Sequence, residues 1–306
     1  MQTEFADAVR AHPALGETVA FPRSELRGWW RSPGGWKLLG GFLGSIRHRY
    51  DVVVDAQGLG RSGFMSLASG AGRRVGYADA REFGWLGLTE RVSVSPSLSA
   101  VDRMLELLRG AKIDPICDLR LHVPADAEDG WVDWKRREIG DAPFVALAPT
   151  SRWRSKEWPS DRWIELARRM IAAGRVVVVL GGPNERSRFD GLEAIGSAVR
   201  VLAGDGPLAW SMAAVRDAEL VVANDSAMLH AAVGFERPLL GLFGPTDPRL
   251  CGPYGRIADC IRAEGVPSEI HYRDRRLDDR LMKRISIDRV VEACLVRLES
   301  ESGASS

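Results

Sequence analysis

Three segments in the second half of the sequence carry small polar side chains, a lysine, a glutamate and a histidine directly after apolar runs. Hydroxyls, a lysine and backbone N–H groups together can bind a diphosphate, and a carboxylate can accept hydrogen bonds from a ribose diol. These residue types therefore indicate a site for a nucleoside diphosphate. The residues are Thr150, Ser151 and Lys156 in the first segment, Glu185 in the second, and Asp225, Ser226, Ala227 and His230 in the third.

The third segment has the pattern strand, polar turn, helix, strand over residues 219–248. Residues 219–223 predict a short buried strand, and Asn224, Asp225 and Ser226 then interrupt it with residue types that begin helices. A helix is expected from there to Gly234, where glycine is a normal C-terminal signal. The first N–H groups of such a helix lack partners and carry partial positive charge, so they suit a phosphate.

Each candidate also has a purely structural interpretation. Asp225 or Ser226 could merely cap a helix, Lys156 could be a surface lysine, Glu185 could be favoured by a helix dipole, and His230 could be a core histidine. We favour a site because the segments follow strands predicted at residues 144–148, 175–180 and 219–223. In a parallel sheet the carboxyl ends of such strands lie along one edge, where ligands bind.

Strands alternate with amphipathic helices through the second half, with helices expected at residues 161–173, 185–196 and 207–216. This alternation is typical of an α/β fold with a doubly wound parallel sheet. A Gly-Asp-Ala-Pro turn at residues 140–143 is the expected domain boundary. We therefore predict two Rossmann-like domains, residues 1–140 and 141–306.

Composition excludes several classes of function. The 306 residues include 42 Lys and Arg against 41 Asp and Glu, a balance that gives no reason to expect nucleic-acid binding. The four cysteines form no CxxC pair, which favours a reducing, cytoplasmic location over a disulfide framework. No apolar run approaches the ~20 residues that span a bilayer. No DxD pair and no GxxxxGK[ST] loop occurs, so we expect neither a metal-bridged diphosphate nor P-loop chemistry.

Residues 23–49 are basic and aromatic, and Glu25 is their single acid. One interpretation is a solvated helix face above packed tryptophans. The other is a surface for an anionic acceptor or for membrane headgroups, which gives peripheral contact with the inner membrane face as a hypothesis. The basic residues are Arg23, Arg27, Arg31, Lys37, Arg47 and Arg49, with Trp29, Trp30 and Trp36 among them.

The string GLGRSG follows a predicted strand at residues 52–55 and matches GxGxxG through Gly58, Gly60 and Gly63. That motif is typical of a dinucleotide site, which also needs an acid about 20 residues further on. Asp79 and Glu82 lie near that spacing, but in a loop context. A nicotinamide oxidoreductase is therefore the weakest of the functions considered.

Taken together, these segments resemble glycosyltransferase family nine, the heptosyltransferases that build the lipopolysaccharide inner core from ADP-heptose. TSRWRSKEWP resembles the family loop that ends in Lys-x-Trp-Pro, GGPNE resembles its Gly-x-Pro-x-Glu loop, and NDSAMLHAA resembles its Asp-Thr/Ser-x-x-x-His turn. LFGPTDP is nearly the family string, and VVVDAQGLGRSG resembles its Asp-x-Gln-Gly-x-x-Arg-Ser segment. The resemblance covers nearly the whole chain.

The resemblance implies a GT-B architecture, with two Rossmann-like domains facing a cleft, and an inverting, metal-independent transfer that uses no cofactor. The donor would be an ADP-heptose-like nucleotide sugar, and the acceptor would be lipid-linked or an oligosaccharide of the lipopolysaccharide core. By resemblance, the diphosphate would be held by Thr150, Ser151, Lys156 and the N–H groups at Ser226 and Ala227. Glu185 would bind the ribose, the turn Gly206-Pro207-Leu208 would flank the adenine, and Asp225 and His230 would complete the turn after their strand.

One departure from the family concerns its first strand, which ends in a Ser-Leu-Gly-Asp turn whose aspartate would be the general base. This sequence carries no such turn, so we expect an incomplete N-terminal domain and assign no catalytic residue. Two hypotheses follow. The chain is either a truncated glycosyltransferase or a catalytically silent relative that binds a nucleotide sugar.

Overall fold

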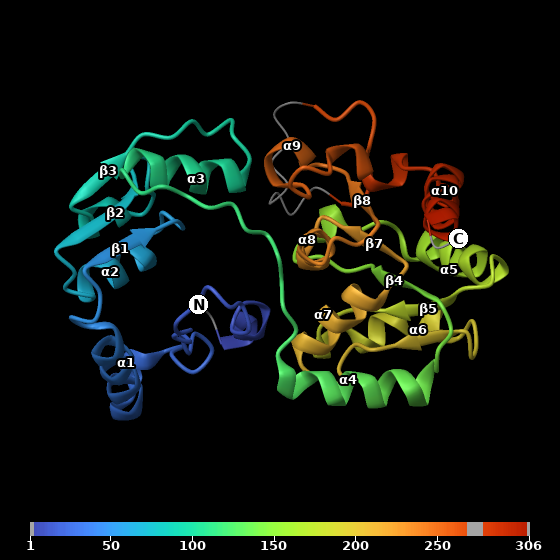
Figure 1. Cartoon of the computed structure of the whole chain (residues 1–306), viewed down its shortest axis with the longest axis horizontal. Coiled ribbons are helices and arrows are strands. Elements are labelled where there is room, and N and C mark those ends of the chain that lie inside the picture. The colour runs from blue at the N-terminus through green and yellow to red at the C-terminus, as the bar shows by residue number, and fades with distance from the viewer. Residues whose placement is uncertain (1–2, 268–277, 305–306) are drawn as a thin grey trace. The chain divides into compact units, whose positions relative to one another are not determined.

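The computed structural model describes residues 3–267 and 278–304 of the chain. Contacts between residues divide the chain into two units (Figure 1). The first unit comprises Met1–Ala6 and Gly16–Asp118, and the second comprises Asp7–Leu15 and Leu119–Ser306. Each unit contains its own parallel β-sheet. No helix in the described ranges is both long enough and apolar enough to cross a membrane.

The first unit has a sheet of order β1-β2-β3 with both pairs of strands parallel. Its strands are β1 (Val52–Asp55), β2 (Arg73–Tyr77) and β3 (Glu90–Val92). Its helices are α1 (Pro33–Ile46), α2 (Gly60–Ala68) and α3 (Ala100–Gly110), with 3-10 turns η2 (Trp29–Arg31) and η3 (Gly84–Gly87). A further 3-10 turn, η1 (Thr3–Ala8), has residues assigned to each unit. Val75, Tyr77, Leu107 and Ala111 form its buried core.

The glycines of the GLGRSG string have a packing role in this unit. Helix α2 lies so close to η3 that a Cβ atom on Gly63 would come within 2.1 Å of the carbonyl oxygen of Gly84. A Cβ atom on Gly60 would come within 2.6 Å of the carbonyl oxygen of Glu82. Since nothing larger than glycine fits these contacts, close packing of α2 accounts for the motif without a dinucleotide.

The second unit has a six-stranded sheet of order β6-β5-β4-β7-β8-β9, in which every pair of neighbours is parallel. Its strands are β4 (Phe144–Ala148), β5 (Val176–Val179), β6 (Val199–Val201), β7 (Leu220–Asn224), β8 (Leu239–Phe243) and β9 (Cys260–Arg262). The chain runs outward from β4 to β6, returns to β7 beside β4, and runs outward again to β9. The strand order therefore reverses between β4 and β7, the position where open α/β sheets bind ligands.

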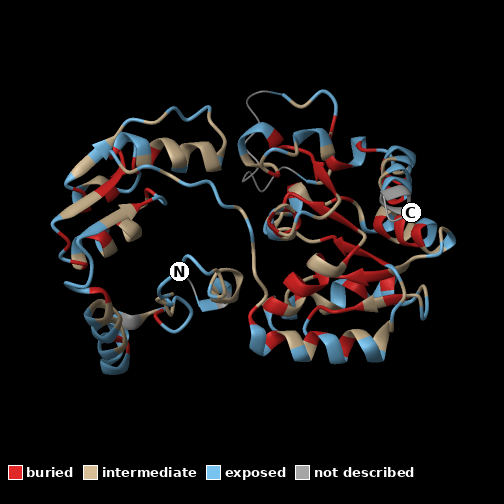
Figure 2. Ribbon diagram, viewed as in Figure 1, coloured by how far each residue is buried: buried red, intermediate tan, exposed pale blue. Residues whose placement is uncertain are grey.

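Helices cover both faces of this sheet. They are α4 (Ala125–Glu138), α5 (Ser160–Ala172), α6 (Asp190–Glu193), α7 (Leu208–Asp217), α8 (Ala227–Gly234), α9 (Pro248–Cys251) and α10 (Ile287–Ala304), with 3-10 turns η4 (Arg154–Lys156), η5 (Pro183–Phe189), η6 (Ile257–Asp259) and η7 (Met282–Arg284). Along β4, Val145 and Leu147 join one buried cluster, whereas Phe144, Ala146 and Ala148 join the other. The central strands are buried on both faces, as parallel strands usually are (Figure 2).

Two local features differ from the sequence-based expectation. Residues 185–196 do not form one helix but the 3-10 turn η5 followed by the short helix α6. Gly191 and Gly196 disfavour a longer helix, and Gly196 adopts φ +125°, a conformation that ends one. Helix α4 packs against α7, so residues 119–140 belong by contact to the second unit, although our proposed domain boundary placed them in the first.

Candidate functional site

The predicted binding residues lie in the segments that follow β4, β5, β6 and β7, at the carboxyl edge of the second sheet. Ala227 and His230 are in the first turns of α8. The register places the end of β4 beside that of β7, with Ala148 opposite Ala223. It also places Leu147 of β4 opposite Val179 of β5. The sequence-based expectation that the three segments lie along one edge is therefore met by the strand order.

Asn224 joins the first loop to β7. Its amide nitrogen donates to the carbonyl oxygen of Pro149 at 2.5 Å, and its amide oxygen accepts from the backbone N–H of Trp158 at 3.2 Å. The side chain is fully buried, so both bonds form away from water. Asn224 is the last residue of β7, and its side chain fixes the two ends of the 149–158 loop instead of beginning a helix.

Asp225 is a buried carboxylate on which several donors converge. Its Oδ2 atom lies 2.6 Å from Lys156 Nζ and accepts from the Thr246 hydroxyl at 2.8 Å. The Cys251 thiol lies 3.6 Å from the same oxygen. The side chains of Lys156 and Asp225 are only 12% and 9% exposed. The structural interpretations of both residues are therefore wrong: Lys156 is not a surface lysine, and the Asp225 carboxylate is not bound to the helix that follows.

Ser226 precedes α8 with an extended backbone, φ −148° and ψ 171°, but its side chain does not cap the helix. Its hydroxyl oxygen is buried and has no hydrogen-bond partner among the described residues. A buried hydroxyl without a partner is costly, and it lies beside the first N–H groups of α8, which the helix itself cannot satisfy. This corner of the site thus offers donors suited to an anion.

Thr150 and Ser151 make hydrogen bonds within the protein. The Thr150 hydroxyl donates to Glu185 Oε2 at 3.0 Å, and the Ser151 hydroxyl donates to the carbonyl oxygen of Asp225 at 3.0 Å. Glu185 Oε2 also accepts from the backbone N–H of Gly182 at 2.7 Å, so Glu185 stabilises the start of η5 as its structural interpretation predicts. The same carboxylate links the loops after β4 and β5, so the two interpretations of Glu185 are compatible.

His230 lies one turn inside α8 and is exposed, so it is not a core histidine. Neighbouring protein atoms still lower its pKa below the ordinary value, because desolvation disfavours the imidazolium. Asp225 opposes this shift and Lys156 reinforces it. His230 therefore interacts electrostatically with both members of the Lys156–Asp225 ion pair.

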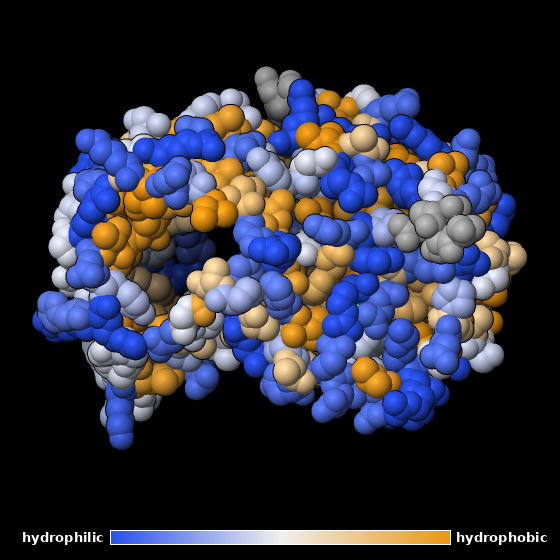
Figure 3. Space-filling model, in the orientation of Figure 1, coloured by the Kyte–Doolittle hydropathy of each residue, from blue (hydrophilic) through white to orange (hydrophobic). Residues whose placement is uncertain are grey.

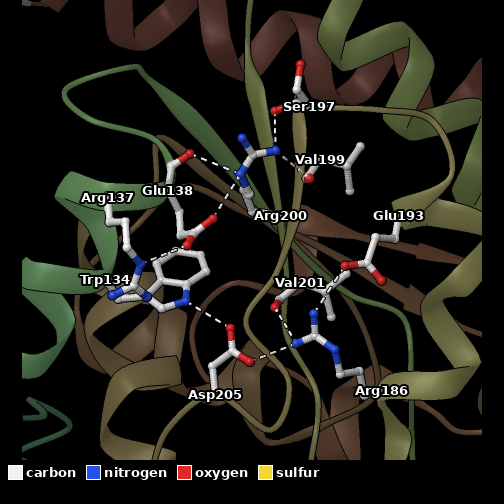
Figure 4. A network of polar contacts seen from close by, with 10 residues as sticks. All are labelled: Trp134, Arg137, Glu138, Arg186, Glu193, Ser197, Val199, Arg200, Val201 and Asp205. Atoms are coloured by element: carbon white, nitrogen blue, oxygen red, sulfur yellow. Dashed lines mark hydrogen bonds and ion pairs between the residues drawn. The ribbon is translucent and has the colours of Figure 1, made fainter.

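The turn Gly206-Pro207-Leu208 begins α7, and Gly206 packs on the ring of Trp210. The preceding residue, Asp205, links this turn to the loop after β5. Its Oδ1 atom accepts from Arg186 Nη1 at 2.8 Å, and its Oδ2 atom accepts from the indole N–H of Trp134 at 3.0 Å (Figure 4). The turn is therefore connected to the segment that carries Glu185.

A cavity of about 590 Å³ reaches the site from the side of α5. Thr150, Glu157 and Arg188 line it, together with the rings of Trp158 and Trp163. Lys156, Asp225 and Ser226 are not part of its wall. Within residues 3–267 and 278–304, no three His, Cys, Asp or Glu side chains gather as metal ligands would.

Sequence reasoning missed the roles of Glu157, Asn224 and Thr246. Glu157 Oε1 accepts from the backbone N–H of Ser151 at 3.0 Å, which orders the first loop. Thr246 belongs to the LFGPTDP string that follows β8, so its position after a strand was a usable signal. For Glu157 the sequence offered only proximity to Lys156.

Solved structures define the class of fold. The structure "E. coli heptosyltransferase WaaC with ADP" matches with a TM-score of 0.75 and 22% identity, over 97% of this chain and 88% of that one. A glycosyl transferase of family 9 from Veillonella parvula matches with a TM-score of 0.76 and 16% identity, over 98% and 87%. The α/β, GT-B fold that we expect from the sequence is thereby confirmed.

Sequence comparison then gives the family. The model described as Glycosyltransferase family 9 (heptosyltransferase) matches residues 42–277. The lipopolysaccharide heptosyltransferase 1 of Pseudomonas aeruginosa is 30% identical over 266 residues, which cover 82% of this chain and 71% of that protein. The enzyme of the same name from Salmonella typhimurium is 28% identical over 68% of this chain and 66% of its own length. The chain belongs to glycosyltransferase family 9, as the resemblance predicted.

Proposed function

We propose that the chain transfers a heptose-like sugar from an ADP-sugar donor to a lipopolysaccharide-core-like acceptor, with inversion and without a metal. The observation that carries this proposal is the cluster of Lys156, Asp225 and Ser226 at the start of α8. There the nearly buried Lys156 and the start of α8 lie at the point where the strand order reverses. The buried Ser226 hydroxyl beside them has no hydrogen-bond partner in the described part of the chain. Family membership supports the same reaction class, and the relative WaaC was solved with ADP.

The proposed chemistry needs positive charge where the diphosphate leaves. The acceptor hydroxyl attacks the anomeric carbon in line with the departing ADP, so one C–O bond forms as the bond to the diphosphate oxygen breaks. Lys156 and the first N–H groups of α8 would stabilise the charge that develops on that oxygen. Asp225 holds Lys156 in place before the donor arrives. The acceptor proton passes to a base that we leave unassigned.

A catalytically silent protein that binds a nucleotide sugar is the alternative. Both functions need the same donor site, so binding alone does not separate them. Release of ADP from ADP-heptose in the presence of a lipopolysaccharide-core acceptor would support the transferase. Tight ADP binding with no release by a folded protein would favour the silent relative.

The donor site itself is tested by calorimetric titration with ADP. Lys156→Ala should weaken binding by ~10- to 100-fold, because it removes a charge-assisted contact to phosphate. Lys135→Ala is a matched control in the same unit, since Lys135 also pairs with an aspartate, Asp217, at 3.3 Å. Equal losses in the two variants, or no ADP binding by the folded parent, would reject the site.

We further propose that residues 23–49 contact a membrane carrying the acceptor, which places the protein in the cytoplasm at the inner membrane face. A cavity of about 970 Å³ in the first unit is lined by apolar side chains such as Leu26, Phe42 and Phe64, with Arg23 and Arg27 also in its wall. Hydrophobic and hydrophilic residues lie side by side on the surface of this unit (Figure 3). Apolar side chains beside arginines suit an anionic lipid surface.

Charge reversal tests this surface. Arg27→Glu combined with Arg31→Glu should abolish binding to vesicles that contain anionic lipid, whereas neutral vesicles should bind neither form. Arg136→Glu provides a control, because Arg136 is an exposed arginine of the second unit. Unchanged binding of the double variant would reject this surface.

A further inference from the structure

Two arginines on η5 reach in different directions from the segment that carries Glu185. Arg186 and Arg188 stand one and three residues after it. Arg188 contacts the loop that follows β4, and Arg186 contacts the loop that follows β6. In the strand order, β5 lies between β4 and β6. The two arginines therefore connect η5, which follows β5, to the loops that follow both neighbouring strands.

Arg188 links the carboxylates of two different loops. Its Nη2 atom lies 2.7 Å from Glu157 Oε2, and its Nη1 atom lies 3.5 Å from Glu185 Oε1. The Glu157 side chain is only 11% exposed, and its other oxygen accepts from the N–H of Ser151. Arg188 thus lies between two negative charges and links the 149–158 loop to η5.

The two oxygens of Glu185 are used unequally. Oε2 accepts hydrogen bonds from the Thr150 hydroxyl and from the N–H of Gly182, so both of its lone pairs are used. Among the described residues, Oε1 makes only the long ion pair with Arg188, at 3.5 Å. A ribose hydroxyl can therefore donate to Oε1 without displacing a short hydrogen bond.

Arg186 makes a denser set of contacts on the other side. Nη1 donates to Asp205 Oδ1 at 2.8 Å and to the carbonyl oxygen of Val201 at 3.1 Å (Figure 4). It also donates to the carbonyl oxygen of Ala203 at 3.3 Å. Nη2 lies 3.1 Å from Glu193. Asp205 is the residue immediately before the turn 206–208, so Arg186 connects η5 to that turn.

We propose that Arg186 and Arg188 are positioning residues, which hold Glu185 between the 149–158 loop and the 206–208 turn. By fixing Glu185 and the turn, they set the selectivity of the site for the donor nucleoside. This inference rests on the proposed function, in which Glu185 meets the ribose and the turn meets the base. Arg188 controls recognition of the ribose hydroxyls, because without it Glu157 and Glu185 repel each other and Oε1 turns away. Arg186 controls recognition of the base, because its hydrogen bond to Asp205 connects the 206–208 turn to η5.

Because these arginines are exposed, an effect of their substitution on nucleotide selectivity can be distinguished from a loss of folding stability. Their side chains are 43% and 44% exposed, and ion pairs that open to solvent contribute little to folding. Removing either guanidinium should therefore leave the protein folded. The effect should fall on the ratio of affinities for related nucleotides, which a merely structural role would not change.

The experiment compares ADP, 2′-deoxy-ADP and GDP by calorimetric titration of the full chain. The parent should prefer ADP over each analogue by ~10-fold or more, the size expected for a hydrogen bond to a charged group. Arg188→Met should bring the ratio of ADP to 2′-deoxy-ADP affinity close to one, with the affinity for 2′-deoxy-ADP nearly unchanged. Arg188→Lys should restore part of the preference.

Arg186→Met should instead reduce the preference for ADP over GDP by ~10-fold and leave the ratio of ADP to 2′-deoxy-ADP unchanged. Arg200→Met is the matched control, since Arg200 pairs with Glu138 at 3.2 Å in the neighbouring network but does not lie on η5 (Figure 4). Arg200→Met should change neither ratio.

Equal losses for all nucleotides in Arg188→Met, or unchanged ratios in either η5 variant, would overturn the proposed positioning while leaving the donor site intact. A folded parent that binds no ADP would overturn the proposed function, and the positioning role with it. The two failures are therefore distinguishable in one set of titrations.

Discussion

The two units bury their sheets to different degrees. Every residue of β4, β7 and β8 in the second unit is buried, whereas β1 and β3 of the first unit are largely intermediate or exposed (Figure 2). The second sheet is covered by helices on both faces and has two large apolar clusters. The described residues of the first unit form one small cluster of buried apolar side chains.

The second unit also contains one ion pair that is far less exposed than the described ion pairs of the first unit, beside solvent-open pairs of its own. The Lys156–Asp225 pair of the second unit is nearly excluded from water, whereas Arg49–Glu17 and Arg73–Glu90 of the first unit are open to solvent. Electrostatic interactions are stronger where water is excluded. The proposed donor site therefore lies where electrostatic interactions are strongest, and the proposed membrane surface lies on the more open unit.

The largest expected effect comes from truncating one buried leucine in each unit. Leu147→Ala should destabilise the second unit by about 4 kcal/mol, because its neighbours on a sheet packed on both faces cannot move into the cavity. Leu107→Ala should cost the first unit about 2 kcal/mol, near the lower limit for such changes, since its small cluster can relax. Urea denaturation followed by hydrogen exchange would assign each loss to its unit. Equal costs would mean that the two cores are equally rigid.

A smaller loss should follow from Lys156→Met, which leaves the Asp225 carboxylate buried without its cation. Breaking a buried pair typically costs about 3–5 kcal/mol. We expect about 2–3 kcal/mol here, because the Thr246 hydroxyl still donates to the same oxygen. Chemical denaturation measures the change. The double variant Lys156→Met with Asp225→Asn should recover much of the stability, and a double variant no more stable than the single one would contradict a buried charge as the cause.

The contrast between the units explains what the sequence could predict. Residues 144–148 and 219–223 were predicted as strands almost to the residue, because strands buried on both faces are continuous apolar runs bounded by polar turns. Glu185 was placed correctly after its strand, but the helix expected around it was not, since a single-sequence pattern does not show that Gly196 adopts φ +125°.

The partners of the site residues were harder to predict. Lys156 and Asp225 were both identified, yet their mutual ion pair depends on how the 149–158 loop folds back on β7 through Asn224. Thr246 reaches Asp225 only because β8 lies beside β7. Such contacts join residues that are far apart in the sequence, and periodicity carries no information about them.

A smaller effect is expected for the exposed pairs. Glu128→Gln in the second unit should cost about 1 kcal/mol, since Glu128 binds both terminal nitrogens of Arg216 at 2.7 and 2.8 Å in a half-open position. Glu90→Gln, its counterpart opposite Arg73 in the first unit, should produce no measurable change. Thermal unfolding in low and high salt provides the comparison. A cost for Glu128→Gln that persists in 1 M salt would indicate packing and not charge.

The smallest effect concerns acid sensitivity of the second unit through His230. Its pKa is lowered in the folded state, so between the ordinary value of about 6.5 and the folded pKa the unfolded chain binds a proton that the folded chain does not. The free energy of unfolding should therefore fall as pH drops through this window. His230→Gln should flatten that dependence by less than about 1 kcal/mol, because Asp225 opposes the shift and solvent still reaches the exposed residue and screens its charge. Denaturation curves at pH 7.5 and 5.5 for parent and variant would test this, and identical slopes would show that carboxylates alone govern the acid response.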